Sequence, residues 1–234
     1  MKSEIFKNHE ALHKAIYNCT RCKDHGYSVE RVQPQWNPKK VHTSSDKWGM
    51  LIGQSPGITE LKRGGGAEKH ETVYESKDRC KHARIAFAGD AGCRLGEWLI
   101  EDAGFTEHHV RTQFYKTAVV KCFPGKDKRG GDRKPTKKEI QLCSPFLKEQ
   151  IRLVNPSVLI PIGKVAINWF FPKVEKLDGV VGKKLQYTCG EQRYVVICLP
   201  HPSNASGWWK IDRNQPILEK AILLLSELRE ASFT

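Results

Sequence analysis

Short apolar segments that end in glycine- or proline-containing turns are the feature that most constrains how this chain can fold. The segments are WGMLIGQSPG (48–57), FYKTAVVKCFPG (114–125), SVLIPIG (157–163) and YVVICLPHPS (194–203). Helix-like patterns lie between them, so predicted strands alternate with predicted helices. In one of these helices Thr136 and Glu139 form a predicted capping box at the start, and Pro145 is expected to cause a break or bend. The alternation of strands and helices favours a mainly parallel sheet that is covered by helices on both faces. We therefore predict an α/β fold with a four-stranded, mainly parallel sheet flanked by helices.

A chain of 234 residues is long enough for one well-buried core, and we predict a single domain over residues 1–234. Two polar segments, at about 61–84 and 125–134, look like insertions into it. The apolar segments are too short to cross a bilayer, so no membrane partner is expected. The sequence MKSEIFKNHE at the N-terminus has no apolar signal region, and we expect a cytoplasmic location.

The charge balance is strongly basic, with 39 Lys and Arg against 26 Asp and Glu and a net charge of +13. Such an excess indicates a polyanionic partner, usually a nucleic acid, although a basic enzyme without such a partner is the alternative. No phosphate-binding loop of the Gly-Lys-Ser/Thr type is present, and no G-x-G-x-x-G follows a predicted strand. A nucleotide cofactor is therefore not expected.

The chain has eight cysteines, and disulfides are rare in a reducing cytoplasm. Some of the thiols are therefore candidates for metal or cluster ligands. The only closely spaced pair is Cys19 and Cys22, about a hundred residues before Cys122 and Cys143.

Ligands of open parallel sheets bind at the carboxyl ends of the strands. This rule selects three turns: GQSPG (53–57), KCFPG (121–125) and HPSNAS (201–206). We expect the three turns to converge on one site.

Five segments, taken in order, resemble the family 4 uracil-DNA glycosylases, which carry an iron-sulfur cluster. They are LIGQSPGITE, AFAGDAGCRLGEWLIEDAGF, YKTAVVKCFPG, PTKKEIQLCSPFLKEQIRLVNPSVLIPIGKVA and LPHPS. The similarity runs from Cys19 to about Ser203. It implies a uracil-DNA glycosylase-like fold with an iron-sulfur cluster loop, DNA as the partner, and a monomer as the default state.

The resemblance also implies a ligand set for a four-iron four-sulfur (4Fe-4S) cluster. By position the ligands are Cys19, Cys22, Cys122 and Cys143, and thiolates suit such a cluster. A zinc site is the alternative. Zinc sites made only of cysteines usually combine two C-x2-4-C pairs, and the second pair here is not one.

The same resemblance assigns roles around a flipped-out nucleotide. His201 stabilises charge on the base oxygen, and Phe87 stacks on the base. The alternatives are structural roles: His201 would cap a turn, and Phe87 would be a core residue. Gln54 and Ser55 lie near the sugar, while Gly53 and Gly57 form the pocket floor beside the base.

Contacts with DNA are implied for the turn that follows His201. Ser203, Asn204 and Ala205 would contact phosphates and enter the minor groove, although the last two are small for a wedge. Lys and Arg in the two insertions would add sequence-independent phosphate contacts, with plain solvated loops as the alternative.

Two positions depart from the family pattern. Gln54 stands where the family usually has Glu, and Ala118 stands where it usually has an Asn that reads uracil. A neutral amide cannot act as a general base, and alanine cannot read a base edge.

These departures lead to a hypothesis about the substrate: a bulky modified pyrimidine, such as glucosylated hydroxymethylcytosine of phage DNA, excised as an antiviral defence. Excision of uracil in repair is the first alternative, and an inactive nucleic-acid-binding module is the second. No lysine is placed by motif to form a Schiff base, so a monofunctional glycosylase is expected.

Overall fold

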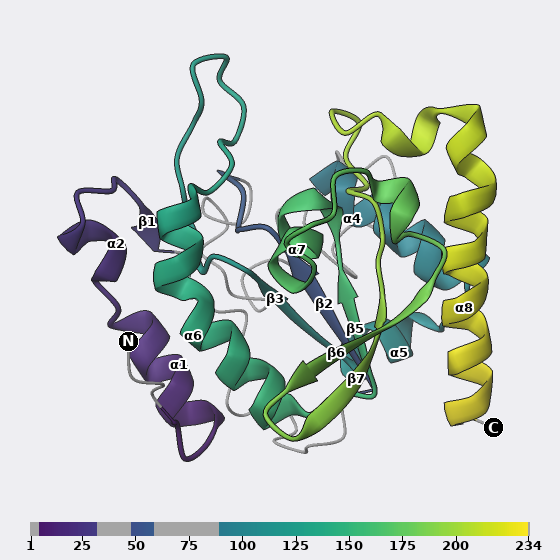
Figure 1. Cartoon of the computed structure of the whole chain (residues 1–234), viewed down its shortest axis with the longest axis horizontal. Coiled ribbons are helices and arrows are strands. Elements are labelled where there is room, and N and C mark those ends of the chain that lie inside the picture. The colour runs from purple at the N-terminus through teal and green to yellow at the C-terminus, as the bar shows by residue number, and fades with distance from the viewer. Residues whose placement is uncertain (1–4, 32–47, 59–88, 234) are drawn as a thin grey trace.

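The computed structural model describes residues 5–31, 48–58 and 89–233 (Figure 1). The predicted insertion at 61–84 lies outside the described residues, as does Phe87. Where the chain is described, no helix is long and apolar enough to cross a membrane.

The central sheet has five strands in the order β3-β2-β5-β7-β6. Four of them are parallel to one another: β2 (Gly49–Gly53), β3 (Phe114–Ala118), β5 (Val158–Pro161) and β7 (Gln192–Ile197). The four strands predicted from the sequence are confirmed. The expectation that the sheet stops at four is wrong, because β6 (Lys184–Cys189) pairs antiparallel to β7 at the edge.

The edge strand β6 was missed because it lacks a continuous apolar run. Its residues alternate between exposed and half-buried along KLQYTC, as is usual for an antiparallel strand with one solvated face. The strands β2 and β5, by contrast, are buried along nearly their whole length.

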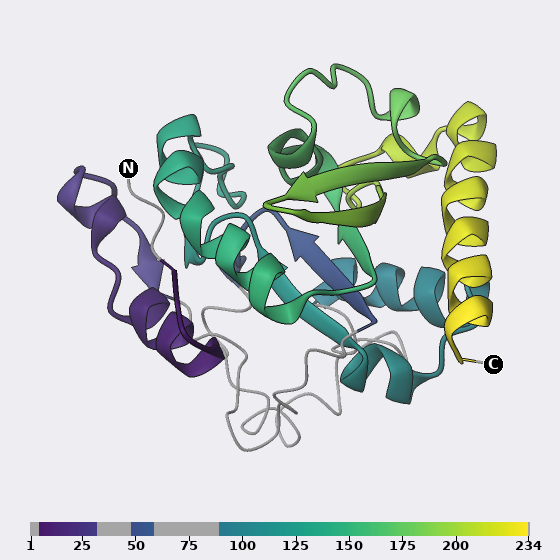
Figure 2. The ribbon, with the colours of Figure 1, turned by 60° about the horizontal axis from the view of Figure 1, so that its bottom comes forward.

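Helices surround this sheet, with α1 beside α6 at one side of the molecule and α8 at the opposite side (Figures 1 and 2). The α-helices are α1 (His9–Tyr17), α2 (Arg21–Asp24), α4 (Gly89–Gly96), α5 (Glu107–Thr112), α6 (Lys137–Val154), α7 (Gly163–Phe170) and α8 (Gln215–Phe233). A π-helical turn, η2 (Glu97–Asp102), continues α4, and three 3-10 turns are η3 (Leu177–Gly179), η4 (Trp208–Lys210) and η5 (Asp212–Asn214).

Helix α6 begins where the sequence predicts. Thr136 accepts a hydrogen bond from the Glu139 backbone N–H, and the Glu139 side chain accepts one from the Thr136 N–H. The predicted break at Pro145 is wrong, because α6 runs through this residue to Val154. A proline inside a helix removes one backbone hydrogen bond, and packing can compensate for this. Both Phe146 and Leu147, the next two residues, are buried in the core.

The described residues have two hydrophobic clusters of very different size. The large cluster joins the sheet to α1, η2, α6, α7 and α8. The small one has only three buried members, Cys22, Val29 and Leu142. Half-buried Cys122 packs against it from the two-stranded sheet made by β1 (Glu30–Arg31) and β4 (Cys122–Phe123). The N-terminal segment around α2 thus has little apolar core of its own.

Candidate active site and cysteine pocket

The carboxyl ends of β2 and β3 are joined by backbone hydrogen bonds. Gly53 pairs with Ala118 in the strand register. Beyond it, Val119 N donates to Gly53 O at 2.9 Å, and Val120 N donates to Gln54 O at 3.0 Å. The first predicted turn, GQSPG, therefore lies beside the segment that leads into KCFPG.

The third turn reaches the same edge through β5 and β7. Ile162 N donates to Ile52 O at 2.9 Å, and Gly163 N donates to Leu199 O at 2.9 Å. These bonds place the start of α7 between the first turn and HPSNAS. The predicted convergence of the three strand ends is confirmed.

The ring of His201 is held in a defined orientation at this edge. The Ser203 backbone N–H donates to His201 Nδ1 at 3.2 Å, and Ser203 Oγ lies 2.8 Å from the same nitrogen. Because a backbone N–H can only donate, Nδ1 is an acceptor, and the neutral ring carries its proton on Nε2. Burial lowers the pKa of His201 below its ordinary value of 6.5, and the positive charge of Lys134 lowers it further.

A glycine lies directly against this histidine. Gly163 has φ +79°, and a Cβ on it would be 3.0 Å from His201 Cβ and 3.1 Å from Cδ2. Sequence reasoning did not select Gly163, although a glycine that ends a buried strand and precedes a helix is a signal of such close approach.

The turn after His201 is supported by tryptophans that sequence reasoning did not select. Trp209 Nε1 donates to Ser203 O at 3.3 Å, and the Arg94 guanidinium lies 4.6 Å from the centre of the Trp209 ring. Asn204 and Ala205 are exposed at the tip, as a surface that contacts DNA requires.

The remaining predicted site residues lie along the same edge. Gly53, Gln54, Ser55, Gly57 and Ala118 are all half-buried, so each has part of its surface available to a ligand. The stacking role predicted for Phe87 falls outside the described residues and stays a prediction.

Close to Ala118 lies the half-buried residue Lys121. Lys121 Nζ donates to Thr117 Oγ1 at 2.9 Å and also to the backbone oxygen of Ala118. Thr117 Oγ1 in turn donates to Gln150 Oε1 at 2.8 Å. Burial lowers the pKa of Lys121 to about 8. These bonds fix the backbone at the end of β3, next to the third predicted cysteine ligand.

The four predicted cysteine ligands line a single pocket. Its walls come from the end of α1, from α2, from β4 and from α6, and they include Cys19, Cys22, Cys122 and Cys143. Cys22 and Cys143 are buried, and Cys19 and Cys122 are half-buried. Segments more than a hundred residues apart in the chain thus present their thiols to one space.

Two of these thiols have surroundings that differ from those of a free cysteine in water. The Lys121 backbone N–H donates to Cys143 Sγ at 3.3 Å, a bond that stabilises a thiolate. Burial and the neighbouring thiols raise the pKa of Cys22 to about 11, so a bound cation is needed to hold it as a thiolate. Among the described residues, no group of three or more His, Cys, Asp or Glu side chains is arranged so that it could hold a metal ion.

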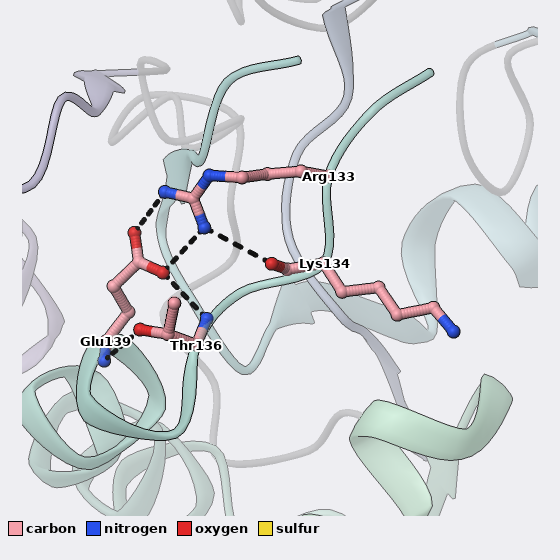
Figure 3. A network of polar contacts seen from close by, with 4 residues as sticks. All are labelled: Arg133, Lys134, Thr136 and Glu139. Carbon is pink, nitrogen blue, oxygen red and sulfur yellow. Dashed lines mark hydrogen bonds and ion pairs between the residues drawn. The ribbon is translucent and has the colours of Figure 1, made fainter. Parts of the chain in front are cut away.

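An ion pair lies close to Cys22. Arg133 donates to both oxygens of Glu139, at 2.7 and 2.8 Å, and Glu139 is fully buried (Figure 3). Glu139 and Arg133 are close enough to Cys22 for their charges to act on its thiol. Hydrogen bonds from Arg133 and Thr136 hold the pKa of Glu139 below its usual range despite burial.

A sheet whose strand ends gather an oriented histidine, next to a pocket of four cysteines, is the arrangement of the glycosylase class indicated by the sequence. The family model described as the Uracil DNA glycosylase superfamily matches residues 45–222. The chain therefore belongs to this superfamily.

The chain is also similar, over most of its length, to several proteins named type-4 uracil-DNA glycosylase. The type-4 uracil-DNA glycosylase of Sulfurisphaera tokodaii is 26% identical over 200 residues, which are 84% of this chain and 74% of that protein. The type-4 uracil-DNA glycosylase of Thermotoga maritima is 27% identical over 195 residues, 83% of this chain and 81% of the relative. That of Pyrobaculum aerophilum is 28% identical over 181 residues, covering 76% and 74%.

We expect Gly163→Ala to displace His201 and to lower the rate of base release at least about tenfold, because the added methyl group overlaps the ring position. The strained backbone should also cost about 1–2 kcal/mol of folding free energy. Gly190→Ala is the matched control, because Gly190 also has a positive φ, of +62°, but has open space around it. Equal activity in the two variants would contradict this account of Gly163.

The lowered pKa of His201 predicts that less than half of its imidazole is protonated at pH 6.5, where an ordinary histidine is half protonated. Half-protonation, and with it the loss of any function that needs Nδ1 as an acceptor, should be reached only below pH 6.5. NMR titration of the ring measures this directly. A midpoint at or above 6.5 would contradict the structure.

Proposed function

We propose that the protein is a DNA glycosylase that hydrolyses the N-glycosidic bond of a flipped-out pyrimidine nucleotide and leaves an abasic site. The single observation that carries this proposal is the geometry of His201. It is a neutral ring with its Nε2–H available, held at the point where three strand ends meet. Membership in the superfamily supports the same reaction class.

Glycosidic cleavage moves both electrons of the bond between C1′ and the base onto the base, and leaves an oxocarbenium-like sugar. His201 would donate its Nε2–H to the base oxygen on which the negative charge develops. Water adds to C1′, and the proton that it loses is taken up by the departing base. Since Gln54 is a neutral amide, its role would be to position this water near the sugar together with Ser55.

The identity of the excised base is the more specific part of the proposal. The curated relatives are named type-4 uracil-DNA glycosylase, and this favours uracil as a substrate. Ala118 favours a second candidate, a larger modified pyrimidine. This small, half-buried side chain ends β3 beside Gly53, where the family resemblance predicts an asparagine that would read uracil. Antiviral defence would follow only if such a base is excised.

Base release from several DNAs tests the reaction and the substrate together. We expect the wild type to release free base from uracil-containing duplexes, from glucosylated phage DNA, or from both, as measured by mass spectrometry. His201→Ala should lower the rate by about 10²–10³ while keeping most DNA binding. If the wild type and His201→Ala are equally inactive on every DNA, the proposal is wrong, and the protein is a nucleic-acid-binding module without catalytic activity.

A cofactor is also part of the proposal. Cys19, Cys22, Cys122 and Cys143 would hold a 4Fe-4S cluster in their shared pocket. When bound, such a cluster links the four segments through metal–thiolate bonds. The chain's contribution is to bring the thiols together, to donate the Lys121 N–H to Cys143, and to shield them with Leu142 and Phe146. The small apolar cluster beside them explains why this region needs an additional link.

Removal of one ligand should remove the cluster and loosen the N-terminal segment. We expect Cys143→Ser, purified without air, to lose most of its iron, acid-labile sulfide and brown colour. It should also unfold at lower temperature, because the pocket loses its cross-links. Cys189→Ser is the control, because Cys189 is a free thiol on β6 outside the pocket. A colourless, iron-free wild type would contradict the cluster.

A further inference from the structure

The basic 125–134 loop is a folded hairpin rather than an open coil, and it projects from the body near the start of α6 (Figure 1). Lys126 and Asp132 form an antiparallel bridge across it, and Lys126 Nζ pairs with the Asp132 carboxylate at 2.7 Å. Asp127 Oδ1 accepts hydrogen bonds from Arg129 N at 2.8 Å and from Gly131 N at 3.0 Å. A loop that is already ordered loses little conformational entropy when it binds a ligand.

The hairpin is fastened to the candidate active site. Asp132 Oδ2 accepts a hydrogen bond from the backbone N–H of Ile58 at 3.0 Å, directly after the GQSPG turn. At its base, Arg133 N donates to Gly125 O at 3.0 Å. The loop therefore keeps a fixed position relative to Gln54 and Ser55.

Lys134 lies between two buried anchors. On one side, Arg133 is bound by both oxygens of Glu139 and also donates to the Lys134 backbone oxygen at 3.2 Å. On the other side, Pro135 is buried. Figure 3 shows the Lys134 side chain extending away from the Arg133–Glu139 pair, with its ammonium at the far end. The contacts of its neighbours thus hold the Lys134 backbone, while its ammonium points away from the Arg133–Glu139 pair.

The positive charges of the loop divide into two groups. Lys126 and Arg133 are neutralised by carboxylates. Lys128, Arg129 and Lys134 are exposed, and in the described part of the chain no hydrogen bond or ion pair involves their side-chain nitrogens. Lys134 follows Asp132, whose side chain is hydrogen-bonded to the residue directly after the GQSPG turn, and of the three cations it is the one whose charge acts on His201.

We infer that Lys134 binds a phosphate of the DNA backbone beside the flipped nucleotide, and that the hairpin and the Arg133–Glu139 pair hold it there. The inference rests on the proposed function for the identity of the ligand, DNA. An exposed ammonium next to the site has no internal role in the described structure, and a backbone phosphate must lie close to any nucleotide whose base reaches His201. Lys134 is then a binding residue that sets the position of the substrate strand.

The test measures DNA affinity against salt without cleavage. The probe is a short duplex that contains 2′-fluoro-2′-deoxyuridine, whose N-glycosidic bond resists hydrolysis. A plot of log Kd against log NaCl concentration counts phosphate contacts, and each contact contributes about 0.9 to the slope. We expect Lys134→Gln to lower the slope by about one contact and to weaken binding about five- to tenfold near 0.1 M salt.

Two further variants make the result specific. Lys134→Arg keeps the charge and should restore the slope. Lys148→Gln removes another exposed lysine, which lies near Cys189 at the hairpin end of β6 and β7, away from the site. This variant should have the same slope and the same Kd as the wild type. The pKa of His201 should rise in Lys134→Gln and stay constant in Lys148→Gln.

The inference is overturned if Lys134→Gln and Lys148→Gln give the same slope as the wild type. Failure of the wild type to release a base from any DNA is a separate outcome. It would overturn the proposed glycosylase activity, while the salt dependence would still decide whether Lys134 binds a phosphate.

Discussion

The parallel pairing of β2 with both β3 and β5 is the constraint on which the rest of the structure depends. Gly49 is level with Phe114 on one side and with Val158 on the other, so the three strands start together and end together. Their turns are consequently close enough for backbone hydrogen bonds such as Val120 N to Gln54 O. A slip of one residue would turn buried side chains to the opposite face, so burial of the strands enforces this register.

Two regions with different sources of stability meet at the end of β3. The sheet and its helices share a large apolar core, whereas the segment around Cys22 has a small one. Lys121 connects them, because its side chain holds the Ala118 and Thr117 positions while its backbone N–H donates to Cys143. Lys121 therefore links the cysteine pocket directly to the carboxyl edge of the sheet.

Local patterns predicted much of this structure. The Thr136–Glu139 capping box, the four buried strands and the convergence of their turns were all available from residue order and spacing. The fifth strand was not, because β6 is only half-buried and its alternating pattern is weak. The break expected at Pro145 does not occur in α6, because a helix tolerates an internal proline when tertiary packing compensates for the lost hydrogen bond.

The sequence by itself determined the fold class, the family resemblance and the residue types at the strand ends, because these depend on periodicity and on short motifs. The tertiary structure placed the four cysteines named by the resemblance in one pocket, and it alone decided that Gly163 lies against His201. It also decided that Arg133 pairs with Glu139 and donates to the backbone oxygen of Lys134. These are contacts between side chains whose distances depend on how whole elements pack, and no local pattern encodes such distances.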